Sequence, residues 1–370
     1  MCTEKHWLSM AAGWVADIDE RGAYGSGWLD TDQDRRLPMQ TLDEYCRRFK
    51  EADAIWPDLP VPADPRQLWW EHWLAGRDPT GYWDDLRRVL PQLYLQPDVD
   101  VHSSDAYKRL VMRGEPPQAD DLRLAPLLHD PSGTTITMAQ HPTGAVPMLT
   151  FRNHDDFVLA VRCLAHRCEA VPIQPTVHAQ AVSGLIHWGL IRALGVRTRC
   201  QILLLHRAPY ASLSVETIPG NPSLERWLEL SQTWRLEHEL THIACRRLVG
   251  EMRINLYDEI VADAMGMTAA LGHFDADLFR RGLGLSSEGI PDRQARAHVY
   301  VSTLEPDQHQ KVFQLTLERA AELERLLNEQ RWPAHSMALL HRLVRGQLTQ
   351  PFTEAAVSEP MSDAYPAQRC

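Results

Sequence analysis

The stretch RLEHELTHIACRRLVGEMRINLYDEIVADAMG, residues 235–266, decides the character of the C-terminal half of this chain. His238 and His242 lie four residues apart, and Glu239 directly follows the first of them. On a helix, residues i and i+4 project from the same face one turn apart, so both imidazoles can reach one metal ion. Glu239 projects about 100° away, where its carboxylate can accept a proton from an attacking water without binding the ion. The pattern therefore predicts a metal site on a helix.

The second half of the same stretch offers further ligands. A catalytic zinc needs a third protein ligand and an open position. Glu259 and Asp263 lie four residues apart on the next predicted helix and share one face. We expect Glu259 to complete the metal site and Asp263 to accept the N–H of a ligating histidine. Asp258 stays open as the alternative ligand, because an error of one residue in the helix register would exchange it with Glu259.

HExxH followed by ExxxD on the next helix resembles the gluzincin class of zinc metallopeptidases, the thermolysin-like group. The resemblance covers residues 235–266. It implies that His238, His242 and Glu259 hold zinc, that Glu239 is the general base, and that Asp263 supports a ligand. It also implies a peptide substrate. The gap between His242 and Glu259 is shorter than is usual in that class, and no GAMEN-like substrate strand is found, so the resemblance favours the metal more strongly than peptidase activity.

Two other functions share the same ligand set. Two histidines and one carboxylate also describe a non-haem Fe(II) oxygenase, which would act on a small molecule or a peptide. A structural ion in a non-enzymatic domain would need no base. Glu239 favours the hydrolase over both. A hydrolase also needs a donor for the developing oxyanion, and the candidates in DRQARAHVY are Arg293, Arg296, His298 and Tyr300.

Composition limits the possible partners and the compartment. The chain has 370 residues and a net charge of −11. An acidic chain without Lys/Arg-rich runs disfavours binding to nucleic acid or to an anionic membrane. The seven cysteines are scattered and form no CxxC motif, and neither a signal peptide nor a transmembrane stretch is visible, so we expect a cytoplasmic protein without disulfides. The sequence does not indicate an oligomeric state.

The remaining patterns predict an α+β fold that is mostly helical. Most of the tryptophans precede residue 84, among them those of LWWEHW, and they indicate a Trp-rich helical region over residues 1–130. A metal-binding α+β domain is expected over residues 131–350, followed by a flexible tail over 351–370. Its small central sheet would use TTITMAQHPTGAVPMLTF (134–151), RCQILLLH (199–206) and YASLSVET (210–217). Helices are expected over 176–195 and 223–250, the second carrying HExxH.

Overall fold

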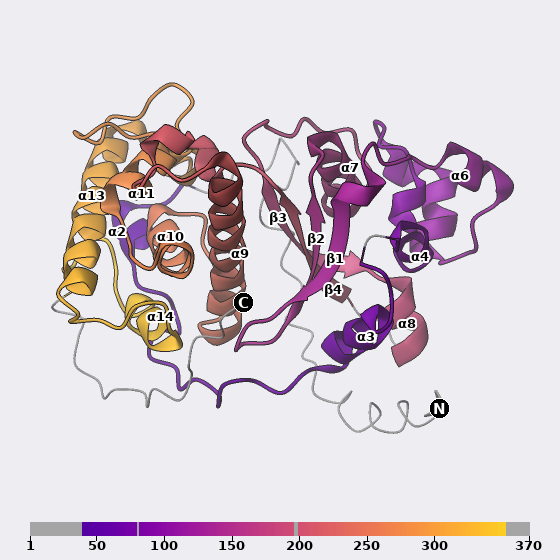
Figure 1. The fold of residues 1–370 in the computed structure, drawn as a ribbon, viewed down its shortest axis with the longest axis horizontal. Helices are drawn as coiled ribbons and strands as arrows, with labels where there is room; N and C mark the ends of the chain where they lie inside the picture. The colour runs from indigo at the N-terminus through magenta and orange to yellow at the C-terminus, as the bar shows by residue number, and fades with distance from the viewer. Residues whose placement is uncertain (1–38, 80, 196–198, 353–370) are drawn as a thin grey trace. The chain divides into compact units, whose positions relative to one another are not determined.

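The structure is a computed structural model that describes residues 39–79, 81–195 and 199–352 (Figure 1). The chain forms two compact units. Of the described residues, 59–207 belong to the first unit, and 39–58 together with 208–352 belong to the second. Each unit has a hydrophobic core cluster of its own.

A four-stranded sheet forms the centre of the first unit. Its strands are β1 (Thr134–Ala139), β2 (Val146–Phe151), β3 (Ala179–Ile186) and β4 (Arg199–His206), in the order β1-β2-β4-β3. β1 and β2 form the predicted antiparallel hairpin, which turns at HPTG, where the N–H of Gly144 donates to the carbonyl of His141. β2 and β4 are parallel, so the chain must cross over between them.

Helix α7 (His154–Ala165) lies within this crossover and packs on β2, β3 and β4 (Figure 1). It begins where Asn153 accepts a hydrogen bond from the N–H of Asp156. Phe157 on the helix lies in the same apolar cluster as Leu149 and Ile202 of the sheet. The burial of these side chains holds the helix against the strands.

The prediction of a helix over residues 176–195 is wrong for the first half of this segment. Residues Ala179–Ile186 form strand β3, antiparallel to β4, and only Trp188–Leu194 form a helix, α8. Gly184 has φ +73°, which breaks a helix and here accompanies a β-bulge between Val182 and Leu185. The predicted end at Gly195 is confirmed, with φ +68°.

The tryptophans of LWWEHW lie in or pack against the core cluster of the first unit. Trp70 and Trp73 on α3 (Pro65–Leu74) are buried in the core cluster of the first unit. Other short helical elements accompany α3: α4 (Trp83–Val89), η3 (Pro91–Tyr94), η4 (Val101–Ser103), α5 (Asp105–Tyr107), η5 (Lys108–Met112), α6 (Ala119–Leu124) and η6 (Pro131–Gly133).

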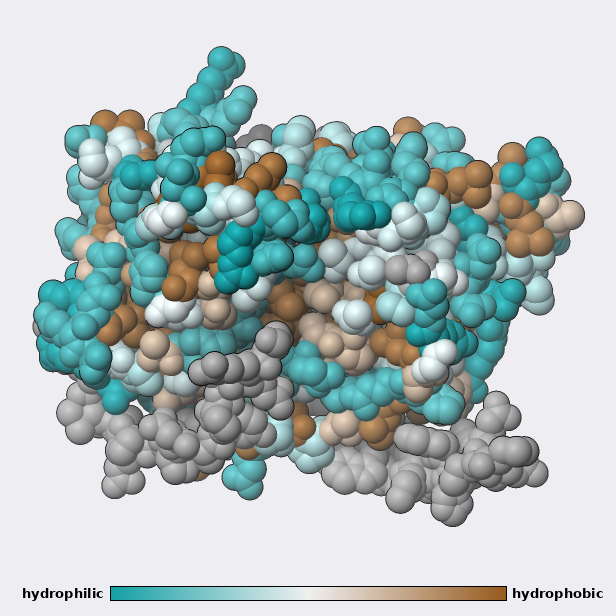
Figure 2. All heavy atoms as spheres, viewed as in Figure 1, coloured by the Kyte–Doolittle hydropathy of each residue, from teal (hydrophilic) through white to brown (hydrophobic). Residues whose placement is uncertain are grey.

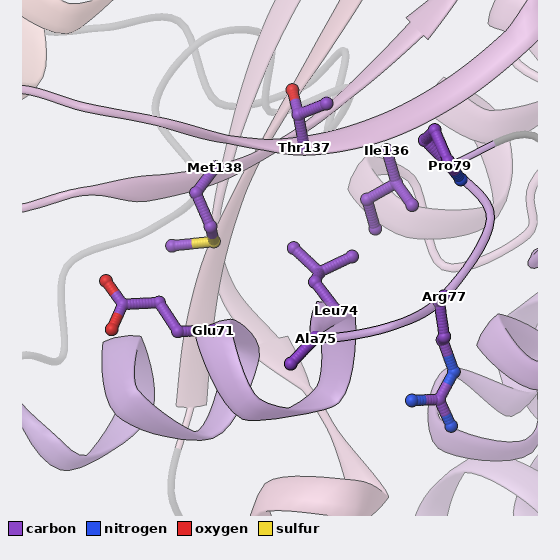
Figure 3. A pocket seen from close by; sticks show the side chains of 8 residues that line it. All are labelled: Glu71, Leu74, Ala75, Arg77, Pro79, Ile136, Thr137 and Met138. Atoms are coloured by element: carbon purple, nitrogen blue, oxygen red, sulfur yellow. The ribbon is translucent and has the colours of Figure 1, made fainter.

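A pocket lies between α3 and β1. Figure 3 shows Leu74, Ile136 and Met138 facing this space, with Glu71 and Arg77 towards its two ends. Its walls are mostly apolar, and none of the predicted site residues lines it.

The second unit is helical and is built around α10 (Leu256–Leu271). This helix is buried over nearly its whole length, and it packs against α9 (Leu224–Leu248), α13 (Pro306–Asn328) and α14 (Met337–Leu343) (Figure 1). Its apolar side chains join the core cluster of this unit, and the acidic residues Asp258, Glu259 and Asp263 are buried with them. The other elements of this unit are α2 (Leu42–Cys46), η7 (Tyr210–Ser212), η8 (Val215–Thr217), α11 (Ala276–Leu283) and α12 (Ala297–Tyr300).

The strand expected over residues 210–217 is wrong, because this segment forms η7 and η8. Ala211 and Ser212 have φ of +47° and +59°, which lie outside the β region of an extended strand. The α+β class itself is confirmed, with a small sheet midway along the chain and helices in the C-terminal half.

The two units divide the chain differently from the sequence-based division at residue 130. Tyr45 and Phe49 lie in one core cluster with Leu256, whereas Trp70 lies in the other cluster with Leu149. The described part of the Trp-rich region is therefore shared between the units, and their boundary falls after β4. Residues 353–370 of the predicted tail lie outside the described residues.

The polar surface and the unpaired cysteines agree with the charged composition and the scattered cysteines of the sequence. On the face drawn in Figure 2, hydrophilic residues predominate and apolar residues form small groups among them. The five cysteines of the described ranges are free and buried. None of the helices described is both long and apolar enough to cross a bilayer.

Candidate metal centre

Helices α9 and α10 supply the predicted ligands. Ser223 caps α9 through a hydrogen bond from the N–H of Arg226, and Asn255 caps α10 in the same way through Asp258. The two helices approach closely at Gly266, where a Cβ would lie 2.5 Å from Cδ1 of Trp234. Glycine at this position lets the two helices share one site.

Three side chains from these helices converge. Nε2 of His238 lies 3.0 Å from Nε2 of His242. The carboxylate of Glu259 lies 3.7 Å from Nε2 of His238 and 3.5 Å from Nε2 of His242. Ligand atoms around a tetrahedral zinc lie about 3.3 Å apart, given bonds of 2.0–2.1 Å. All three residues are buried, and together they can hold a metal ion.

Asp263 orients the imidazole of His238 through a hydrogen bond from its Nδ1. Its Oδ1 accepts a hydrogen bond from Nδ1 of His238 at 2.8 Å and from Nε1 of Trp234 at 2.8 Å. Because a carboxylate only accepts, Nδ1 of His238 carries the proton and Nε2 presents its lone pair to the cluster. This is the contact that the spacing of Glu259 and Asp263 predicts.

Tyr210 and Trp234 are members of the site that sequence reasoning missed. The Tyr210 hydroxyl donates to Oδ1 of Asp263 and lies 3.0 Å from Nδ1 of His238. Its ring stacks on Trp234 at 4.1 Å between centroids. Burial raises the pKa of Tyr210 well above its usual value, so the phenol stays a donor. Trp234 lies one turn before His238, which was a usable signal, whereas nothing in the local sequence marks Tyr210.

Glu259 is ionised in this setting. Burial alone would raise the pKa of its carboxyl, but His238, His242 and Arg296 outweigh burial and lower that pKa to about 2. Nη2 of Arg296 lies 3.2 Å from Oε2 of Glu259. For His238, burial lowers the pKa of the imidazole, but the charges of Asp263 and Glu259 outweigh it and raise the pKa.

Asp258, the alternative ligand, faces another partner. Its carboxylate forms an ion pair with Arg253 at 2.8 Å and accepts from the backbone N–H of the same residue. It lies about 100° around the helix from Glu259. The structure therefore places Glu259, and not Asp258, beside the two histidines.

The four predicted oxyanion donors of the segment DRQARAHVY do not all lie at the site. Tyr300 is buried, and its hydroxyl accepts from Nη2 of Arg296 at 2.9 Å, next to Glu259. Arg293 and His298 are exposed, and Nε2 of His298 bonds to the carbonyl of Asp292. Of the candidates in this segment, the structure brings Tyr300 and Arg296 to the site.

Glu239 is buried on the same helix as the histidines. Burial raises the pKa of its carboxyl, against the charges of His238 and His242. A carboxylate with a raised pKa is better matched to proton transfer near neutral pH.

The comparisons with known proteins give a family and no activity. No curated protein and no solved structure matches the chain. One family profile, described as "Family of unknown function (DUF7005)", matches residues 33–200 and 197–350. These two segments cover most of the sequence, so the chain belongs to the family DUF7005.

Proposed function

We propose that this protein is a zinc-dependent hydrolase of gluzincin-like design, with peptides as the first substrate class to test. The observation that carries the proposal is the convergence of His238, His242 and Glu259 at ligand spacing, with Asp263 on the far nitrogen of His238. Two imidazoles and one carboxylate with an open position are a common catalytic zinc set. The free cysteines fit the cytoplasm as the proposed compartment.

The side chains take distinct roles in this proposal. A bound zinc would act as a Lewis acid and lower the pKa of a water molecule. Glu239 would accept the proton of the attacking water and pass it to the leaving group. Asp263 holds the ring of His238, and Tyr210 and Trp234 hold Asp263. Tyr300, paired with Arg296, would donate to the oxyanion of the substrate.

The test separates the base from the ligands. Glu239→Gln removes a proton acceptor and keeps the metal ligands, so zinc content should stay while cleavage falls about a hundredfold or more. The measurements are elemental analysis and cleavage of a mixed peptide library followed by mass spectrometry. Glu237→Gln on the same helix is the matched control and should leave both unchanged.

Other outcomes would contradict the hydrolase proposal or support one of the alternative functions. If cleavage is found and Glu239→Gln leaves it intact, the hydrolytic mechanism is wrong. Bound iron after anaerobic purification, with oxygen consumption that depends on His238, would support the Fe(II) oxygenase that shares this ligand set. Bound zinc without turnover of any peptide, and with a large loss of stability on chelation, would support a structural ion.

A further inference from the structure

We infer that the first unit holds a second metal site, formed by His154, His178 and His206, which takes a divalent transition metal such as Zn²⁺ or Cu²⁺. These three histidines lie at the ends of three separate elements. His154 opens helix α7, His178 directly precedes strand β3, and His206 ends strand β4.

The ends of the sheet strands bring the group together. The N–H of His206 donates to the carbonyl of His178 at 2.8 Å, which extends the pairing of β3 and β4 by one step. The next residue, Arg207, donates to the carbonyl of Phe151 at the end of β2. On the other side of the crossover, Arg152 directly follows β2, and α7 begins two residues later at His154. The first turn of α7 therefore lies at the same end of the strands.

The distances suit a single ion. One ring nitrogen from each histidine lies within 4.8 Å of the corresponding nitrogens of the other two. Nδ1 of His206 lies 3.0 Å from Nδ1 of His178, close to the separation of about 3.3 Å between two ligands of a tetrahedral zinc. The ring centroid of His154 lies 5.0 Å from that of His206 and 5.7 Å from that of His178.

The outer contact of His206 selects the ligating tautomer. Its Nε2 lies 3.3 Å from the backbone carbonyl oxygen of Arg152. Because a carbonyl only accepts, Nε2 carries the proton and Nδ1 presents a lone pair toward His178. Metal-binding histidines are commonly fixed in this way by a backbone carbonyl.

The third histidine adds an observation of its own. Nε2 of His154 is buried and has no hydrogen-bond partner among the residues that the structure describes. A buried polar nitrogen without a partner is costly. A metal bond within the histidine group would give the ring a partner.

The donor set selects the class of ion. The group contains three imidazoles and no carboxylate. Neutral imidazoles suit Zn²⁺, Cu²⁺ and Ni²⁺, whereas Ca²⁺ and Mg²⁺ require oxygen ligands. The three rings are only half-buried, which leaves a coordination position for water or another small ligand.

Counting ions distinguishes this site from the first one. After chelation and dialysis, the wild-type chain should bind two Zn²⁺. The variant His238→Ala/His242→Ala should bind one, and adding His206→Ala should weaken that remaining ion by more than about a hundredfold, beyond the loss typical of an outer contact. Adding His72→Ala, an exposed histidine of α3, is the matched control and should leave the ion in place.

A spectroscopic measurement distinguishes the loss of one ligand from the misfolding of a variant. Cu²⁺ added to His238→Ala/His242→Ala should give an electron paramagnetic resonance spectrum with nitrogen coordination from three imidazoles, and His154→Ala should reduce it to two. Circular dichroism checks the fold of each variant. The inference is overturned if the double variant binds no Zn²⁺, or if His206→Ala leaves the ion bound with unchanged affinity. In that case, the short distance between His178 and His206 is an ordinary hydrogen bond between two histidines.

Discussion

At the scale of the residue, Asp263 is the most informative side chain of the candidate metal centre. One of its oxygens accepts from His238, Trp234 and Tyr210. Asp263→Ala should weaken zinc binding by about ten- to a hundredfold, because His238 loses the group that fixes its tautomer. Asp263→Asn should be milder, since the amide oxygen still accepts. Competition with a chromogenic chelator measures both affinities.

The control for this residue is Asp277→Ala on α11, where the carboxylate pairs with Arg280 at the surface. Its zinc affinity should equal that of the wild type. Equal affinity in Asp263→Ala as well would mean that Asp263 contributes only to packing. The gluzincin-like arrangement that we propose would then lose its outer carboxylate.

At the scale of the element, the contact between α9 and α10 decides whether the ligands meet. Gly266→Ala would place a Cβ 2.5 Å from Cδ1 and 2.7 Å from the backbone oxygen of Trp234. The backbone oxygen cannot swing away, so the helices must separate. We expect a loss of about 1–3 kcal/mol in the free energy of unfolding, and weaker zinc binding because His238 and Glu259 come from different helices. Urea unfolding and chelator competition measure the two effects.

Gly282→Ala in α11 is the matched substitution. There the new Cβ would lie 3.4 Å from Cβ of Ala211, an ordinary contact. Alanine is the better helix former, so the free energy of unfolding should stay or rise by up to about 1 kcal/mol. If both glycine variants behave alike, the close approach of α9 and α10 at Gly266 does not control the site.

At the scale of the whole molecule, two core clusters in two units predict two thermal transitions. In His206→Ala, which lacks the second proposed site, zinc at a hundred times its Kd should stabilise only the second unit, by about 2.7 kcal/mol. That corresponds to a rise of about 5–10 °C in one transition. Differential scanning calorimetry with and without zinc measures it. A zinc-induced rise that persists after His238→Ala/His242→Ala is added would contradict this assignment.

The sequence by itself determined the features that depend on local geometry. The helical period places His238 and His242 on one face, and Ser223 and Gly250 bound their helix, because caps and turns act within a few residues. The hairpin of β1 and β2 and the apolar strand β4 were predictable for the same reason. These patterns also sufficed for the α+β class.

Only the tertiary structure decided the features that join distant segments. The rotation of α10 in its packing against α9 brings Glu259 rather than Asp258 to the histidines, and a sequence pattern does not fix that rotation. Tyr210 reaches Asp263 across 53 residues of chain. His154, His178 and His206 carry no motif, because the ends of β3 and β4 and the start of α7 bring them together only when the sheet forms. Contacts between segments far apart in the chain arise from packing, whose geometry local sequence does not specify.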